Sequence, residues 1–144
     1  MAIGATPLKN TERIIKAFHL ASAGKDVKLV VAGRPNNIKL EPERNIRFLG
    51  HVPQNDQSAL LSGARGLVFA SLYEGYGIPI LEGFACGVPV VTSNIGSMPE
   101  VAGNAAILVD PTDTNSIADG IAQILRGAKA YVDKGTARVK DFSW

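Results

Sequence analysis

Short, mostly apolar runs alternate with longer amphipathic stretches along the chain, and this alternation constrains the fold more than any other feature of the sequence. Apolar runs rich in β-branched residues lie at 27–32, 67–70 and 88–92, as expected of strands buried on both faces of a parallel sheet. The segments 11–23 and 114–126 instead repeat apolar residues at the helical period. Strands that alternate with helices predict an α/β domain with a Rossmann-like parallel sheet and helices on both faces.

Several shorter segments complete this pattern. Further strands are expected at 1–4, 46–49 and 106–109, and further helices at 55–64, 79–86, from 97 onward and at 128–141, with an exposed loop at 36–44. Asn10 or Thr11 is expected to cap the first helix, and Ser97 and Glu100 have the spacing of a capping box. Because the carboxyl ends of parallel strands share one edge, the turns after the first four strands should meet there and form the ligand site.

Length and composition limit the classes of protein to which the chain can belong. Its 144 residues, 46% apolar and 19% charged, are typical of one globular domain, 1–144. No apolar run reaches the roughly 18 residues of a membrane span, and Met1 leads directly into a strand rather than into a signal peptide. Cys86 is the single cysteine, so neither a disulfide nor a metal cluster is expected, and a reducing cytoplasm fits best. A net charge of +2 gives little support to nucleic-acid binding.

The stretch from Glu74 to Glu82 reads Glu-Gly-Tyr-Gly-Ile-Pro-Ile-Leu-Glu and joins an expected strand to an expected helix. Gly75 and Gly77 allow a tight turn with uncovered amides, and Pro79 suits the first turn of a helix. Free N–H groups at a helix start bind anionic phosphate. Glu82 is expected in that first turn, where a carboxylate repels phosphate unless it has another task, such as accepting hydrogen bonds from sugar hydroxyls. The spacing alone is equally consistent with two surface carboxylates that stabilise the helix dipole.

The same stretch carries a resemblance to a known family. Its Glu-x7-Glu spacing, the wider match over 71–93 and 96–106, and the final Phe-Ser-Trp at 142–144 resemble the donor-binding, C-terminal half of retaining GT-B glycosyltransferases. That group includes glycogen and sucrose synthases and many bacterial mannosyl- and glucosyltransferases. The match to 96–106 is closest in character to bacterial mannosyltransferases.

The resemblance implies a role for each residue of the motif. Glu82 would hold the ribose hydroxyls of the nucleotide. Glu74 would contact the transferred sugar and help to stabilise positive charge near its anomeric carbon. The backbone amides of Tyr76, Gly77 and Ile78 would serve the sugar and the diphosphate.

Other residues of the site are implied by weaker matches. Lys9, in a turn that resembles the family's Arg-Lys-Asn, would bind the donor diphosphate. Leu8 stands where many members carry Arg, so a second cationic phosphate ligand is missing, comes from Arg34, or is supplied by another part of the enzyme. The segment around Val52 resembles the loop that borders the nucleobase. His51 either contributes there or is an exposed loop histidine, and Arg34 either stacks on the base or lies in solvent.

The function implied by the resemblance is metal-independent transfer of a hexose to a glycan or lipid acceptor. The donor would be a nucleotide diphosphate sugar, GDP-mannose before UDP-glucose, and no cofactor is expected. The N-terminal acceptor-binding domain of such enzymes is absent from this sequence, so the chain alone is expected to transfer little, and any peripheral contact with the inner face of the membrane would be made through that domain. The alternatives are a non-catalytic nucleotide-binding module, half of a split enzyme, or a nucleotide-sugar epimerase. No Gly-x-Gly-x-x-Gly follows the first strand, which disfavours a dinucleotide oxidoreductase.

Overall fold

The computed structural model describes residues 1–36 and 43–142, so most of the loop expected at 36–44 and the last two residues of the Phe-Ser-Trp match lie outside the described residues. Six parallel strands form one sheet in this part of the chain. They are β1 (Ala2–Ile3), β2 (Leu29–Ala32), β3 (Ile46–Gly50), β4 (Leu67–Phe69), β5 (Val90–Ser93) and β6 (Ile107–Val109).

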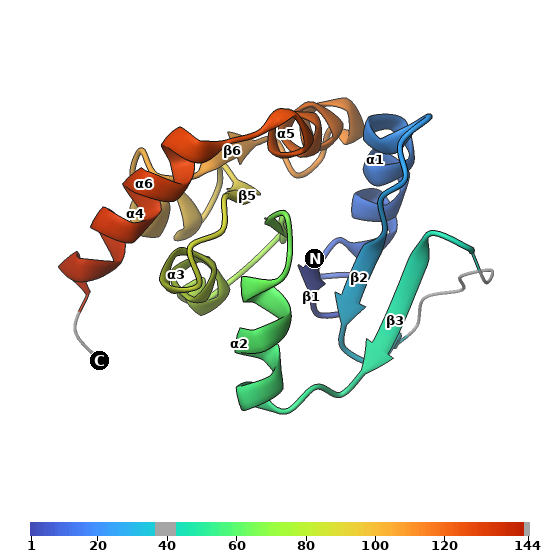
Figure 1. Ribbon diagram of the computed structural model, residues 1–144, viewed down its shortest axis with the longest axis horizontal. Helices are drawn as coiled ribbons and strands as arrows, with labels where there is room; N and C mark the ends of the chain where they lie inside the picture. Colours follow the sequence, from blue (N-terminus) through green and yellow to red (C-terminus); the bar gives the residue numbers. More distant parts are fainter. Residues whose placement is uncertain (37–42, 143–144) are drawn as a thin grey trace.

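The strand order is β3-β2-β1-β4-β5-β6, and every neighbouring pair is parallel. The chain therefore builds one half of the sheet outward from β1 and the other half outward from β4. At this reversal β1 leads to α1 (Thr11–Ser22) on one face of the sheet and β4 leads to α3 (Ile78–Ala85) on the other. In sheets of this kind ligands bind in a crevice at the carboxyl ends of the strands, between these two connections. The predicted Rossmann-like parallel sheet is confirmed (Figure 1).

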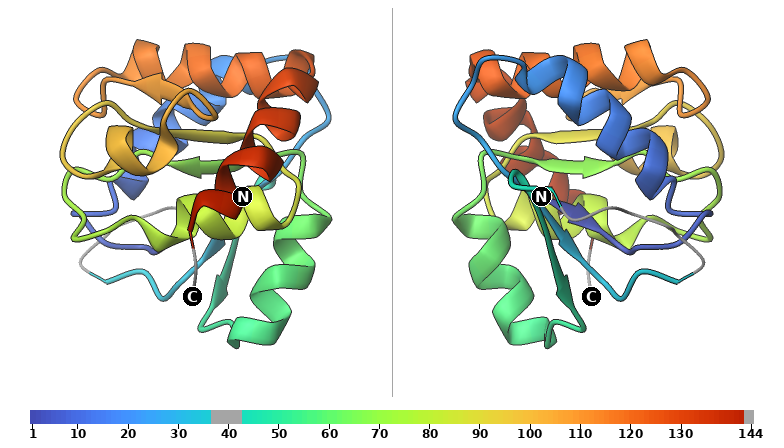
Figure 2. Two further views of the ribbon diagram at one scale, coloured as in Figure 1. Left: turned by 90° about the vertical axis from the view of Figure 1, so that its left-hand side faces the viewer. Right: turned by 90° about the vertical axis from the view of Figure 1, so that its right-hand side faces the viewer.

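Helices cover both faces of the sheet. They are α1 (Thr11–Ser22), α2 (Gln54–Ser62), α3 (Ile78–Ala85), α4 (Met98–Ala102), α5 (Thr114–Arg126) and α6 (Lys129–Arg138), followed by a 3₁₀ turn, η1 (Val139–Asp141). Helices α1 and α5 pack together on one face, while α3 contacts α2, α4 and α6 on the other. The side views show these two layers with the sheet between them (Figure 2).

Two buried apolar clusters, one on each face of the sheet, make up the core. Glycine allows a helix to approach the sheet closely on both sides. A Cβ at Gly83 of α3 would lie 2.7 Å from Val90 Cγ2, and one at Gly120 of α5 would lie 2.8 Å from Val109 Cγ1. These spacings fix the height of α3 above the strands, and with it the position of the turn that precedes α3.

Candidate functional site

The structure brings Lys9 and Glu74 together at the reversal of the strand order. The Lys9 Nζ lies 2.5 Å from the Glu74 Oε1, although the two residues are 65 positions apart in sequence. Their side chains are 28% and 14% exposed, so the pair lies at the mouth of the crevice rather than in open solvent. The backbone joins the same two turns, because the N–H of Leu72 donates to the carbonyl of Leu8 over 2.9 Å.

Lys9 is held on its other sides as well. Its ammonium lies 4.9 Å from the centre of the Phe69 ring, within reach of a cation–π interaction. Gly4 leaves room for its aliphatic stem, since a Cβ at that position would lie 2.5 Å from the Lys9 Cγ. Nothing in the sequence identified Gly4 as part of the site, because its only contribution is the space that its missing side chain leaves for Lys9.

Asn10 ties three crevice loops together. Its Nδ2 donates to the carbonyl of Ala70 over 2.9 Å and to that of Pro111 over 2.7 Å, while Arg13 donates to its Oδ1 over 2.7 Å. Asn10 is the N-cap residue of α1, as expected, but its side chain makes no cap hydrogen bond and its φ is 62°. A buried amide therefore fixes the turn that carries Lys9 against the loops after β4 and β6.

Ser97 departs from its predicted role in the same way. It precedes α4, but its side chain makes no cap hydrogen bond, so the predicted capping box is wrong. Its hydroxyl donates instead to the backbone carbonyl of Glu74 over 3.2 Å. The loop after β5 therefore supports the residue that pairs with Lys9, and the local spacing of Ser97 and Glu100 gave no sign of this long-range contact.

The turn before α3 carries the two glycines of the motif. Gly77 is the N-cap residue of α3 with φ 87°, a conformation that suits glycine, and Pro79 lies in the first turn as predicted. A Cβ at Gly75 would meet no atom within 4 Å, so the turn is open on that side. Tyr76 and Ile78, on either side of Gly77 in the chain, are 51% and 47% exposed.

Glu82 lies further along α3 than expected. It is the fifth residue of α3, in the second turn and not in the first. The Nε2 of Gln57, from α2, donates to its Oε2 over 3.4 Å. Partial burial raises the pKa of the Glu82 carboxyl above its usual value. Gln57 was not recognised in the sequence, since no spacing links it to the motif.

Arg34, His51 and Val52 follow the next two strands at the same edge. The N–H of Gly33 donates to the carbonyl of Gly50 over 2.8 Å, which joins the ends of β2 and β3. Arg34 and His51 are exposed, while Val52 is half-buried. His51 and Val52 line a hollow of about 490 Å³ against α2, the helix that also carries the Gln57 partner of Glu82.

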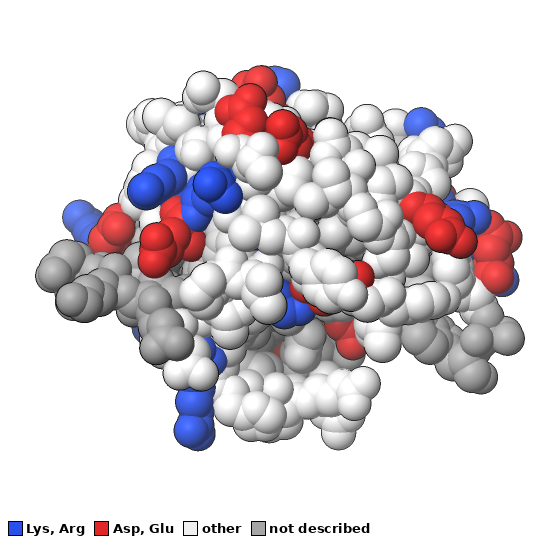
Figure 3. Space-filling view, turned by 180° about the vertical axis from the view of Figure 1, so that it is seen from behind, with Lys and Arg blue, Asp and Glu red and all other residues white. Residues whose placement is uncertain are grey.

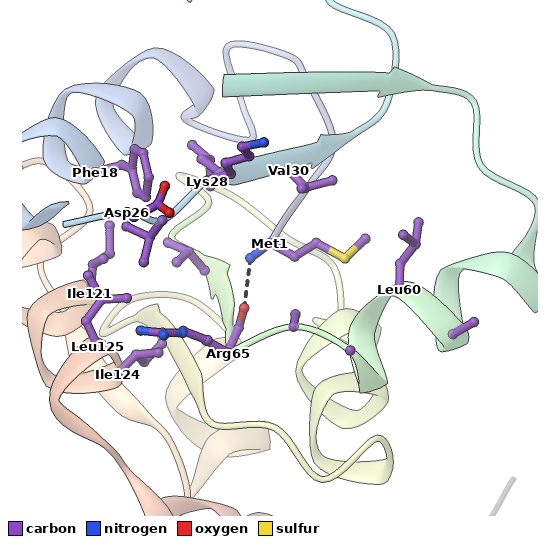
Figure 4. Close-up of a pocket in the computed structure, with 17 residues that line it drawn as sticks. Met1, Phe18, Asp26, Lys28, Val30, Leu60, Arg65, Ile121, Ile124 and Leu125 are labelled. Atoms are coloured by element: carbon purple, nitrogen blue, oxygen red, sulfur yellow. Dashed lines mark hydrogen bonds between the residues drawn. The ribbon is translucent and has the colours of Figure 1, made fainter. Parts of the chain in front are cut away.

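Charges of both signs also lie close together on the surface. In the space-filling view, basic and acidic side chains lie side by side at a hollow near the middle of the rear face (Figure 3). A larger cavity, of about 620 Å³, lies at the opposite edge of the sheet, where Met1, Leu29 and Val68 line it (Figure 4). The site residues follow the carboxyl ends of the strands, so this larger cavity is separate from them.

Within residues 1–36 and 43–142, no three His, Cys, Asp or Glu side chains gather in a manner that would hold a metal ion. None of the helices in that described part has both the length and the hydrophobicity needed to cross a bilayer.

Comparison with known proteins identifies related sequences. The model of the family described as "Glycosyl transferases group 1" matches residues 4–138. The O-antigen chain mannosyltransferase B of Escherichia coli is 46% identical over 102 residues, which cover 69% of this chain and 27% of the relative. The MMP alpha-(1->4)-mannosyltransferase of Mycolicibacterium hassiacum is 31% identical over 159 residues, which cover 100% of this chain and 39% of the relative. The chain thus spans well under half the length of these relatives.

A solved structure shows the same fold. The Anabaena protein Alr3699/HepE, whose crystal structure is a complex with UDP and glucose, matches with a TM-score of 0.79 at 20% identity. The match covers 97% of this chain and 43% of that protein. At this identity the comparison establishes the architecture of the domain, and the residues of the crevice carry the argument about chemistry.

Proposed function

This chain belongs to the family of group 1 glycosyl transferases, and we propose that it is the domain that binds the donor nucleotide sugar in a retaining hexosyltransferase. The observation that carries the proposal is the Lys9–Glu74 ion pair at the reversal of the strand order, beside the amino end of α3. A cation, a carboxylate and a helix start there provide complementary groups for a diphosphate that bears a sugar.

The chemistry follows from the charges that develop when the sugar–phosphate bond breaks. Negative charge grows on the leaving diphosphate, and positive charge grows on the sugar ring. We assign Lys9 and the amides of Tyr76, Gly77 and Ile78 to the diphosphate, and Glu74 to the sugar. Positioning and electrostatic stabilisation then supply the catalysis. In the free protein Lys9 and Glu74 neutralise each other, so the incoming diphosphate takes over the ammonium and leaves the carboxylate available to sugar hydroxyls.

The nucleoside end of the donor is assigned to the other side of the crevice. Glu82 would accept hydrogen bonds from the ribose hydroxyls, with Gln57 orienting its carboxylate. Val52, His51 and Arg34 would border the nucleobase at the ends of β2 and β3. The resemblance to the family motif supports the assignment of Glu82, and the positions of Arg34, His51 and Val52 after β2 and β3 support theirs.

A second cation for the diphosphate must come from elsewhere than position 8. Leu8 is 61% exposed at the crevice turn and carries no charge. Arg13, the nearest arginine in sequence, donates to the Asn10 Oδ1 and to the Pro111 carbonyl and is therefore occupied. We assign the role to Arg34 or to the domain that binds the acceptor.

The names of the relatives support the choice of sugar. Two mannosyltransferases among them favour a GDP-mannose donor, and the neighbour solved with UDP and glucose keeps UDP-glucose as the next candidate. We further propose transfer that needs neither a metal nor another cofactor, because Lys9 supplies the positive charge opposite the leaving group. The acceptor, a glycan or a lipid carrier, would be bound mainly by an N-terminal acceptor-binding domain.

Calorimetric titration with GDP, UDP and ADP tests the proposal. We expect one base to bind preferentially and the Glu82→Gln variant to lose about tenfold in affinity, because a charge-assisted hydrogen bond to ribose becomes a neutral one. The matched control is Glu100→Gln, which removes an exposed carboxylate on α4 and should leave affinity unchanged. Equal affinity of all three nucleotides, or of Glu82→Gln and the unaltered chain, would contradict the assignment.

A further inference from the structure

A hollow of about 430 Å³, here called the junction hollow, lies at the amino-end edge of the sheet, where α5 ends and α6 begins. Arg65, in the turn before β4, lines it together with Arg126 and Lys129 from the α5–α6 junction. Gly66 lets the two segments approach each other, because a Cβ at that position would lie 2.8 Å from the Ile124 Cδ1. Two parts of the chain that are far apart in sequence therefore place three cationic side chains around one opening.

The lining of the junction hollow carries an excess of positive charge. The side chains of Arg65, Arg126 and Lys129 are all exposed. Among the ion pairs of the described residues, none includes either arginine. Lys129 pairs with Asp133 over 3.1 Å, but these side chains are 86% and 65% exposed, and pairs so open to solvent are weak. Three cations and one carboxylate leave two positive charges in excess.

The larger cavity beside it is not charged in the same way. Asp26 and Lys28 line that cavity with charges of opposite sign, and Arg65 lines both spaces. Figure 4 shows the Arg65 side chain extending toward Ile124 and Leu125 of α5. The positive charge in excess is therefore concentrated at the junction hollow.

The remaining lining strengthens the effect of the cations. The carboxyl end of α5 and the amino end of α6 meet here, so their helix dipoles oppose each other and neither sets the sign of the potential. Ile124, Leu125 and Val132 contribute apolar walls. Walls of low dielectric constant focus the field of the cations into the opening. The junction hollow should therefore attract an anion.

We propose that the junction hollow binds a dianionic phosphate group, carried either by a free phosphate compound or by a lipid headgroup. The guanidinium groups of Arg65 and Arg126 would present paired N–H donors to the phosphate oxygens, and Lys129 would exchange Asp133 for the ligand. A phosphate group carries a charge of about −1.5 to −2 at pH 7, which matches the two positive charges in excess. The site lies at the opposite edge of the sheet from the donor crevice, and it does not rest on the proposed function.

Nuclear magnetic resonance titration of the isotope-labelled chain with inorganic phosphate, at an ionic strength held constant with chloride, tests the proposal. We expect a saturable shift of the Gly127 amide signal, which reports on the junction hollow. A shift at Gly77 would report separately on phosphate in the donor crevice. The double variant Arg65→Gln/Arg126→Gln should weaken phosphate binding at Gly127 by at least about tenfold, because charge-assisted hydrogen bonds to phosphate are lost.

The matched control is Lys134→Gln/Lys140→Gln, which removes the same charge from exposed positions outside the junction hollow and should leave phosphate affinity at Gly127 unchanged. A Gly127 signal that does not move with phosphate, or equal affinities in the arginine and lysine variants, would overturn the proposal. Co-sedimentation with phosphatidylcholine vesicles that contain phosphatidic acid, lost only in the arginine variant, would identify a lipid headgroup as the source. A shift with inorganic phosphate and no such co-sedimentation would identify a free phosphate compound.

Discussion

Replacement of Asn10 tests whether one buried amide holds the crevice together. The side chain makes three hydrogen bonds, two as donor to the carbonyls of Ala70 and Pro111 and one as acceptor from Arg13. The backbone adds a second constraint, because a φ of 62° suits glycine and asparagine but is costly for alanine. The pair Asn10→Gly and Asn10→Ala separates these two contributions.

The magnitudes follow from the contacts. The Pro111 carbonyl keeps its bond from Arg13 at 3.2 Å, so the main losses are the bond to Ala70 and the bond from Arg13. Buried neutral hydrogen bonds contribute about 1 kcal/mol each and those to a charged donor about 1.5–3, so Asn10→Gly should lower the free energy of unfolding by about 3 kcal/mol. Asn10→Ala should lower it by about 1–2 kcal/mol more, because the left-handed conformation then carries a Cβ.

Urea unfolding followed by circular dichroism measures both differences. The matched control is Asn55→Ala, an exposed residue of α2, which should stay within about 0.5 kcal/mol of the unaltered chain. A loss for Asn10→Gly no larger than that of the control would refute the argument that the amide ties the loops. Equal losses for the glycine and alanine variants would refute the backbone part alone.

Three further predictions use other contacts. Lys9→Met should weaken binding of GDP by about 10–100-fold but leave guanosine binding unchanged, because a charge-assisted bond to phosphate is lost. Titration with both ligands measures this effect. The control Lys16→Met, on the exposed face of α1, should change the affinity for neither ligand. The folded Met1 amine has a pKa of about 6 against 8.0 in the unfolded chain, so the unfolded chain binds more protons between these values. The free energy of unfolding should therefore fall by about 2 kcal/mol as pH falls from 8 to 6. N-terminal acetylation should abolish that pH dependence in urea unfolding, and a dependence that survives acetylation would assign it to another group. Gly120→Ala should lower the free energy of unfolding by about 1–3 kcal/mol, because the new Cβ would lie 2.8 Å from the Val109 Cγ1. Gly63→Ala, whose Cβ would lie 3.6 Å from its nearest atom, should lower it by less than about 1 kcal/mol in the same assay.

The sequence predicted those features that depend on periodicity and chain order. Apolar runs such as 67–70 and 88–92 became neighbouring parallel strands, β4 and β5, because a buried strand needs apolar side chains on both faces. The shared edge of the sheet followed from topology, which is why Lys9 and Glu74 were expected to meet although they are distant in sequence. Boundaries were less accurate: the segment expected as a strand from residue 27 begins to pair at Leu29.

The sequence did not predict where the short polar side chains make their bonds. Asn10 and Ser97 both stand at the start of a helix, where a local cap is the usual partner. Each instead binds a carbonyl from a distant loop, that of Ala70 in one case and that of Glu74 in the other. The rule for helix caps considers only hydrogen-bond partners that are close in sequence. It contains no information about acceptors that the fold brings near. Asp113, the N-cap residue of α5, does make a local cap, because its side chain accepts from the Asn115 N–H.

The same limit applies to the two glutamates of the motif, which the spacing treats as equivalent. Glu74 lies against the Lys9 ammonium, so its charged form is compensated within the free protein. Glu82 lies in the second turn of α3 beside the neutral amide of Gln57, and partial burial raises its pKa. In the proposed function, Glu74 would lose its partner when a diphosphate binds Lys9, and its carboxylate would then face the sugar as a free charge. A partly desolvated carboxylate already lacks hydrogen bonds that ribose hydroxyls can supply. The fold thus gives one residue type two electrostatic environments, and each environment suits the role proposed for it.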